Sequence, residues 1–169
     1  TFRRDIQTKP MPPTKTLIEK LHESAVSMLG KDASPLDMAN DDLACAESVA
    51  NIINSTLTVG ASIPLSGSDG FPIVISTTDL FNRLRADKRF AFSEVPEPGT
   101  IIVSYTGDPK ATGAIPHGHC GIFGKDGKIM SNTSFGVGRG RWEENYTIDS
   151  WVARFRKQGG YSIYYFRPI

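Results

Sequence analysis

Apolar residues recur at helical spacing in three segments of the first half of the chain. Residues 16–29 and 77–87 each carry one apolar face. A further helix is expected to begin near Asp41 or Asp42, whose carboxylates can accept hydrogen bonds from its first amides, and Cys45 then falls within its first turn. The three apolar faces consist of Leu17, Leu21, Ala25, Met28 and Leu29, of Ala46, Val49, Ala50 and Ile53, and of Leu80, Phe81 and Leu84.

Short apolar or alternating runs, which are typical of β-strands, replace this pattern from residue 90 onward. One helix, around 147–157, interrupts them. Helices that come first and strands that come later predict an α+β fold, in which N-terminal helices pack on a small antiparallel sheet. The predicted strands are 90–95, 99–105, 118–123, 127–134 and 161–166.

The composition is that of an ordinary globular domain, and the length of 169 residues favours one domain. Residues 1–15 are rich in Lys, Arg and Pro and are expected to form a basic leader or linker, so 16–169 make up the single domain. The net charge of +1 provides no field that attracts nucleic acid. No apolar run approaches the length of a membrane span.

The two cysteines, Cys45 and Cys120, are too few for a disulfide framework or an all-cysteine zinc site. His119 and Cys120 are adjacent, and neighbours on a strand do not easily ligate one metal. We therefore expect neither a metal nor a cofactor. A Cys45–Cys120 disulfide is possible, although Cys120 as a small buried apolar residue is the favoured interpretation.

The segment "KDGK" at 125–128 predicts a tight hairpin, because Asp and Gly suit the positive φ angles of a two-residue type I′ turn. In the register that follows, His119 faces Ser134. Asn132 lies diagonally from His119 on the same face of the sheet, and Cys120 points to the other face.

Three residues have the types that nucleophilic catalysis needs. A thiol at a helix start, here Cys45, is activated by unpaired amides and the helix dipole. An imidazole, here His119, completes the ion pair of a cysteine hydrolase. A third polar group orients the imidazole, and Asn132 is the candidate, with Ser134 as an alternative. A cysteine in a first helical turn is more often structural, so the pattern alone leaves both interpretations open.

Three segments also carry a family resemblance. "LACAESVANII" (43–53) is similar to the nucleophile helix of NlpC-type and CHAP-type cysteine amidohydrolases and endopeptidases, which have a papain-like fold. "PEPGTIIVS" (96–104) resembles their strand entry, and "GHCGIFGKDGKIMSNTS" (118–134) resembles their His-x-Gly-Ile hairpin. The resemblance covers most of residues 16–134. It assigns the nucleophile to Cys45, the base to His119 and the orienting residue to Asn132.

The sequence departs from the family pattern at some positions. Ala44 and Ala46 flank Cys45 where Asp and Ser are usual, and Thr100 replaces an Asp. At these positions the sequence resembles phage-type or prophage-type relatives more than a housekeeping cell-wall enzyme.

The resemblance implies a peptidoglycan hydrolase that cuts an amide bond of the stem peptide through a thioester. Such a protein would act at the bacterial cell wall, as a periplasmic, secreted or virion-associated protein, with peptidoglycan as its substrate. The chain would then be a whole enzyme or a part of a larger polypeptide or virion. Two alternatives remain: a cysteine acyltransferase of the same fold, and a catalytically silent wall-binding or virion structural module.

Other residues near these segments are weaker candidates. Glu47, His117 and the loop 135–146 can contact substrate, but a structural role or simple solvation is the more ordinary interpretation. Trp142 and Trp151 are expected in the core.

Overall fold

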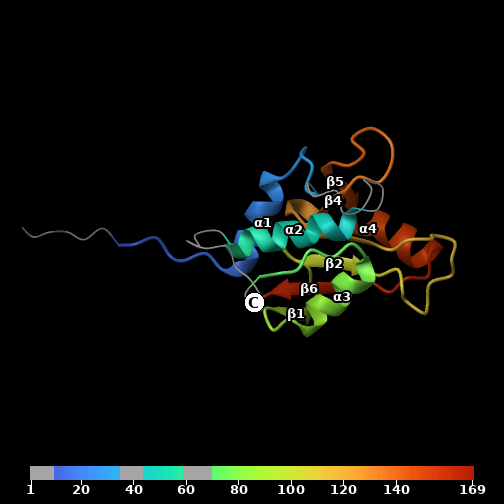
Figure 1. The fold of residues 1–169 in the computed structure, drawn as a ribbon, viewed down its shortest axis with the longest axis horizontal. Helices are drawn as coiled ribbons and strands as arrows, with labels where there is room; N and C mark the ends of the chain where they lie inside the picture. Colours follow the sequence, from blue (N-terminus) through green and yellow to red (C-terminus); the bar gives the residue numbers. More distant parts are fainter. Residues whose placement is uncertain (1–9, 35–43, 59–69) are drawn as a thin grey trace, which may run out of the picture.

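One antiparallel sheet organises the part of the chain that the structure describes (Figure 1). The structure is a computed structural model, and it describes residues 10–34, 44–58 and 70–169. The strand order is β1-β6-β2-β3-β4-β5, and all neighbouring strands are antiparallel. The strands are β1 (Phe90–Ser93), β2 (Ile101–Ser104), β3 (His119–Phe123), β4 (Lys128–Asn132), β5 (Trp142–Thr147) and β6 (Tyr164–Pro168).

The helices precede the sheet in the sequence, apart from one that lies between β5 and β6. They are α1 (Leu17–Ser27), α2 (Cys45–Thr58), α3 (Thr77–Ala86) and α4 (Ile148–Trp151), which continues as the π-helical segment η2 (Val152–Gln158). Figure 1 shows α1 and α2 side by side and α3 next to β1. The predicted α+β class with an antiparallel sheet is therefore confirmed.

Helix starts agree with the sequence where the structure describes them. Thr16 caps α1 in a reciprocal pair with Glu19, and the Ser76 hydroxyl accepts a hydrogen bond from the Asp79 amide at the start of α3. Helix α2 begins at Cys45, which confirms that this residue lies in a first turn. The expected cap at residues 41 and 42 lies outside the described residues.

Side chains of the central strands are buried on both faces of the sheet. Ile101, Val103, Cys120, Ile122 and Met130 pack against the helices α1, α2 and α3. On the other face, Ile102, Phe123 and Ile129 pack against Trp151, Phe155 and Tyr161 of α4, η2 and the segment after it. The sheet thus lies between two apolar layers, and alternation along each strand decides which layer a side chain enters.

The hairpin between β3 and β4 corrects the predicted register. Asp126 and Gly127 have the expected positive φ angles of 57° and 69°, and the Lys128 amide donates to the Lys125 carbonyl. The Gly124 amide also donates to the Lys128 carbonyl, so two residues lie opposite one. This bulge shifts the pairing by one residue, so that Ile122 faces Met130.

The sequence analysis did not predict β5, which forms an edge of the sheet from part of the loop proposed at 135–146. Its pairing with β4 contains a second bulge, because Ile129 pairs with Tyr146 and Met130 with Glu144. Asn145 lies between these two pairs and is the extra residue of the bulge. The edge strand therefore presents Asn145 in a position that regular pairing does not provide.

Residues 10–15 are exposed and form no helix or strand. Among the described residues, no helix combines the length and apolar character needed to cross a bilayer.

Candidate active site

Cys45 opens onto a pocket at the start of α2. The residue is 7% exposed, and its side chain lines a cavity of about 340 Å³. The walls come from the start of α3, the loop that ends at Gly118, the start of β3, the segment after β4, and η2. The lining includes Thr77, Thr106, Ile115, His117, His119, Phe135, Tyr146 and Arg154.

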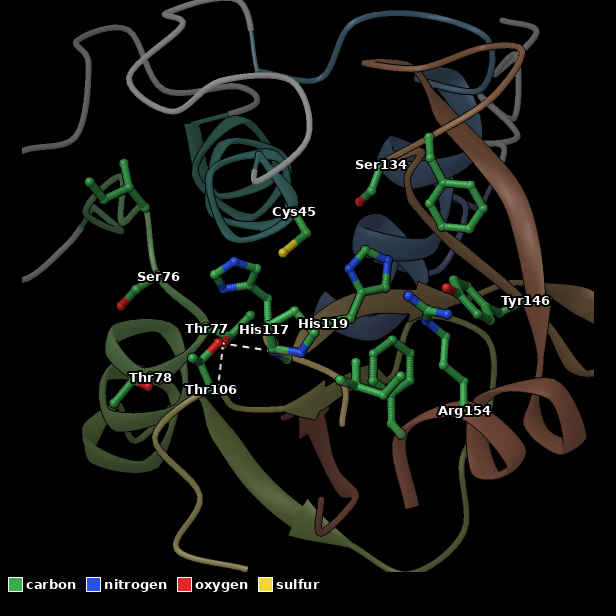
Figure 2. A pocket seen from close by; sticks show the side chains of 16 residues that line it. Cys45, Ser76, Thr77, Thr78, Thr106, His117, His119, Ser134, Tyr146 and Arg154 are labelled. Atoms are coloured by element: carbon green, nitrogen blue, oxygen red, sulfur yellow. Dashed lines mark hydrogen bonds between the residues drawn. The ribbon is translucent and has the colours of Figure 1, made fainter. Parts of the chain in front are cut away.

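Two imidazole rings flank the Cys45 sulfur atom (Figure 2). His117 belongs to the exposed loop before β3, and His119 is the first residue of that strand. One ring nitrogen of His119 faces the sulfur, and the interaction with this ring helps to lower the pKa of the Cys45 thiol. The structure thus brings together the predicted nucleophile and the predicted base.

A hydrogen-bond relay holds the far side of the His119 ring. The Nε2 atom of His119 lies 2.9 Å from the Ser131 Oγ atom, and Ser131 Oγ donates to Asn145 Oδ1 at 2.5 Å. The Asn145 amide group donates in turn to the Ser131 carbonyl and to Thr133 Oγ1, both at 3.2 Å. The Asn145 oxygen must therefore face Ser131 and accept its only hydroxyl proton.

This relay determines the tautomer of His119. Because Ser131 gives its proton to Asn145, its oxygen can only accept from His119, so Nε2 carries a proton. The Nδ1 atom is then the nitrogen that faces Cys45 and can take the thiol proton. A base with one nitrogen held and the other turned to a nucleophile has the geometry that covalent catalysis needs.

Aromatic side chains enclose the His119 ring, which is only 5% exposed. It stacks on Trp151 and Phe155, with ring centroids 5.3 Å and 5.7 Å apart, and it contacts Tyr146 at 5.5 Å. The Trp151 Nε1 atom donates to Ser104 Oγ at 3.1 Å, which anchors the indole. The imidazole therefore has little freedom to turn away from Cys45.

The surroundings of Cys45 favour its thiolate form. A hydrogen bond from the Cys120 side chain is the largest cause, and the hydrogen bond and positive charge of His119 act in the same direction. Although burial opposes them, the pKa of the Cys45 thiol lies well below its ordinary value. Burial raises the pKa of Cys120, and the neighbouring Cys45 raises it further, so Cys120 stays a thiol. Both cysteines are free.

Asn132 does not hold His119, which corrects the prediction. In the shifted register Asn132 shares a strand face with Met130, on the side of Cys120, while Ser131 shares the face of His119. Asn132 is buried and borders a second pocket, but the hydrogen bond of the imidazole is made to Ser131. The alternative Ser134 lines both pockets without bonding His119.

The loop that carries His117 is braced at its base. Thr106 Oγ1 lies 3.0 Å from Thr77 Oγ1 and accepts a hydrogen bond from the Gly118 amide at 3.0 Å (Figure 2). A Cβ atom at Gly118 would collide with the Ser104 carbonyl, so only glycine fits there. This bracing sets the positions of His117 and His119 on the two sides of Gly118.

The weaker candidates differ in their positions. Glu47 is buried on α2, whereas His117 and Phe135, the first residue of the loop 135–146, line the pocket beside Cys45. Trp142 and Trp151 are fully buried, as expected of core residues. In the described part of the chain, no group of three or more His, Cys, Asp and Glu residues is arranged to hold a metal ion.

Ser131 and Asn145 are the functional candidates that the sequence analysis missed. Ser131 differs from the predicted residue by one position, and only the bulge at the hairpin turn decides between them. Asn145 lies on a strand that was not predicted. The aromatic residues Trp142 and Tyr146 on either side of two glutamates were the available indication of an edge strand.

Comparisons with known proteins add no assignment to this geometry. No protein-family model matches the chain, and no curated protein matches it in sequence.

Proposed function

We propose that this chain is a cysteine amidohydrolase or endopeptidase of papain-like fold that cleaves an amide bond in peptidoglycan. One observation supports this proposal above the others. Cys45, with a lowered pKa, lies at a helix start and faces an imidazole whose far nitrogen is bonded to Ser131 and Asn145. The proposed catalytic set is therefore Cys45 and His119, with Ser131 and Asn145 as positioning residues.

In the first step, His119 Nδ1 takes the proton of Cys45, and the sulfur attacks the carbonyl carbon of the amide. The C–N bond then breaks, His119 returns the proton to the departing amine, and a thioester on Cys45 remains. The positive end of the α2 dipole, where Cys45 lies, is suited to stabilise the oxyanion during attack.

In the second step, His119 accepts a proton from water, and the hydroxide formed attacks the thioester carbonyl. The C–S bond breaks, the product leaves as a carboxylic acid, and Cys45 is restored. The ordered ring of His119 suits this double role, because the same nitrogen must face the departing amine and then the water.

The choice of peptidoglycan rests on the resemblance of the helix, strand-entry and hairpin motifs. The motif residues lie where this interpretation needs them, because Cys45 heads α2 and His119 heads β3. The pocket is lined by hydroxyl groups together with apolar side chains, a mixture that suits a short peptide.

The deciding experiment is digestion of purified peptidoglycan with the full chain, followed by mass analysis of the fragments. Wild type should release fragments with a new carboxylate and a new amine, and Cys45→Ala should release none. His119→Ala should be comparably inactive. His117→Ala is the matched comparison. His117 lies on the opposite side of the sulfur, so we expect its replacement to reduce digestion much less.

Other results of the same experiment would favour the alternatives. Fragments in which the acyl group is joined to another amine or alcohol indicate an acyltransferase that uses the same thioester. Binding to peptidoglycan without any Cys45-dependent fragment contradicts the hydrolase proposal and favours a structural wall-binding module.

A further inference from the structure

Arg154 is the single lysine or arginine among the described residues that line the two adjoining pockets beside His119. The second pocket, of about 370 Å³, adjoins the first, and His119, Phe135, Tyr146 and Arg154 are among the residues that line both. No aspartate or glutamate lines either pocket within the described residues. The groove beside His119 therefore carries one strong positive charge without a neighbouring acid.

The guanidinium group of Arg154 is held by aromatic rings. Its central carbon lies 5.6 Å from the ring centroid of Phe135 and 5.7 Å from that of Phe155. The Arg154 side chain makes no hydrogen bond or ion pair with any described residue, whereas Arg89 pairs with Asp87 and Arg167 with Glu97. Ring contacts orient the group, and its N–H donors remain open to a ligand.

The location of Arg154 indicates which part of a substrate it would meet. Figure 2 shows the Arg154 side chain on the far side of the His119 ring from Cys45. During cleavage the acyl carbon becomes bonded to the Cys45 sulfur, whereas the amine departs toward His119 and takes its proton from Nδ1. A leaving group that extends past the imidazole, away from Cys45, therefore meets Arg154, and the acyl part does not.

We propose that Arg154 binds a carboxylate carried by the leaving amine, so that the preferred substrate is an amide formed by the amino group of an amino acid. A guanidinium presents two parallel N–H donors that match the two oxygens of a carboxylate. This inference rests on the proposed function, because it takes the direction of the leaving group from that mechanism.

The test uses iodoacetate and iodoacetamide, which have nearly the same shape and differ in charge. Each alkylates the Cys45 sulfur, forming a C–S bond and releasing iodide. The measured quantity is the ratio of the two rates at Cys45, followed by mass analysis of the peptide that contains it. We expect Arg154→Met to lower the iodoacetate-to-iodoacetamide ratio severalfold, because the positive charge of Arg154 attracts the anionic reagent into the pocket that Cys45 also lines.

Two variants control for charge and for folding. Arg156→Met removes the same charge from an exposed position of the same helical segment, outside the pockets, and should keep the wild-type ratio. Arg154→Lys should keep part of the preference. Equal ratios in wild type and Arg154→Met would overturn the proposal, and so would an equal fall in Arg156→Met.

A second measurement needs no variant. Alanine should slow the alkylation of wild-type Cys45 by iodoacetamide more than alaninamide does, since only alanine has a carboxylate. Equal slowing, or none, counts against the proposal.

The two proposals fail in different ways. Cys45-dependent digestion with equal cleavage of stem peptides and their carboxamide forms leaves the hydrolase standing and refutes the role of Arg154. An Arg154-dependent preference for iodoacetate without any digestion supports the role of Arg154 and refutes the hydrolase.

Discussion

The imidazole of His119 is bonded through Nε2 to the hydroxyl of Ser131, at 2.9 Å, across two strands whose pairing is shifted by a bulge. That bond leaves Nδ1 to face Cys45. It also makes Ser131, and behind it Asn145, responsible for the orientation of the His119 ring.

Replacing Ser131 by Ala should therefore slow the reaction while leaving the nucleophile and the base in place. The expected loss in kcat/KM is roughly ten- to hundredfold, the value of a hydrogen bond to a group that becomes charged. Ser134→Ala is the matched control, because Ser134 lines the same pocket without bonding His119. A Ser131→Ala enzyme with an unchanged pH profile and full rate would exclude the relay.

The lowered pKa of Cys45 predicts the pH dependence of its alkylation by iodoacetamide. Only the thiolate reacts, so the rate rises as pH passes upward through the pKa. The midpoint should lie below about 8.5, the usual value of a free cysteine. His119→Ala removes a hydrogen bond and a positive charge, so its midpoint should move to higher pH. A shift to lower pH would contradict the assigned ion pair.

Cys120 is expected to influence the same titration from its buried position. Cys120→Ala removes the hydrogen bond that contributes most to the lowered pKa of Cys45, so the alkylation midpoint should rise. Cys120→Ser keeps a donor at this position and should shift the midpoint less. If the two variants behave alike, the S–H group of Cys120 has no part in stabilising the thiolate.

Gly121 allows β3 and β4 to approach closely beside the relay. A Cβ atom there would lie 2.6 Å from the Met130 carbonyl oxygen and 3.2 Å from the Ser131 Cβ atom. Gly121→Ala should lower the free energy of unfolding by about 1–3 kcal/mol, as overpacking does. Gly124→Ala in the same hairpin is the control, since a Cβ there makes only ordinary contacts. Denaturant unfolding of both variants measures the difference.

Asp108 connects the loop after β2 to the start of the final strand segment. Burial raises the pKa of its carboxyl, but the amides of Lys110 and Ser162, at 2.9 Å and 2.7 Å, outweigh burial and hold that pKa below its ordinary value. A carboxyl group whose pKa is depressed in the folded protein stabilises the fold at pH values above about 3.9, its pKa in the unfolded chain. This contribution is lost as the pH falls through the pKa of the folded state.

Asp108→Asn should consequently be less stable than wild type at pH 7 by about 1–3 kcal/mol, because an amide serves poorly as a double acceptor. The difference between the two proteins should shrink as the pH falls below 4. Thermal unfolding across this pH range checks the sign, and a constant difference would refute it.

The sequence located Cys45 and His119, the proposed nucleophile and base, because strong local patterns carry them. The apolar spacing of Ala46, Val49, Ala50 and Ile53 places a helix, and Cys45 stands at its beginning. The run from His119 to Phe123 is continuous strand. Both patterns arise from burial within one element, which a single sequence reveals well.

The relay could not be found in the same way. Whether Ser131 or Asn132 faces the imidazole depends on the bulge at the turn. The alternation of side chains along a strand does not reveal a bulge. The strand that carries Asn145 lies at the edge of the sheet. Edge strands carry charges that hide their pattern, as Glu143 and Glu144 do here.

The bulge at the hairpin tip decides which side chain meets the imidazole. The same residues closed without the bulge would pair Lys125 with Lys128 and Gly124 with Ile129, which would turn Asn132 to the face of His119 and Ser131 to the opposite face. Deleting Gly124 would instead remove the bulge and keep the strands in place, because Phe123 would still pair with Ile129. Relatives with a turn one residue shorter can therefore keep their orienting group on the same face, so alignments of such sites are best anchored on strand pairing and not on the length of the turn.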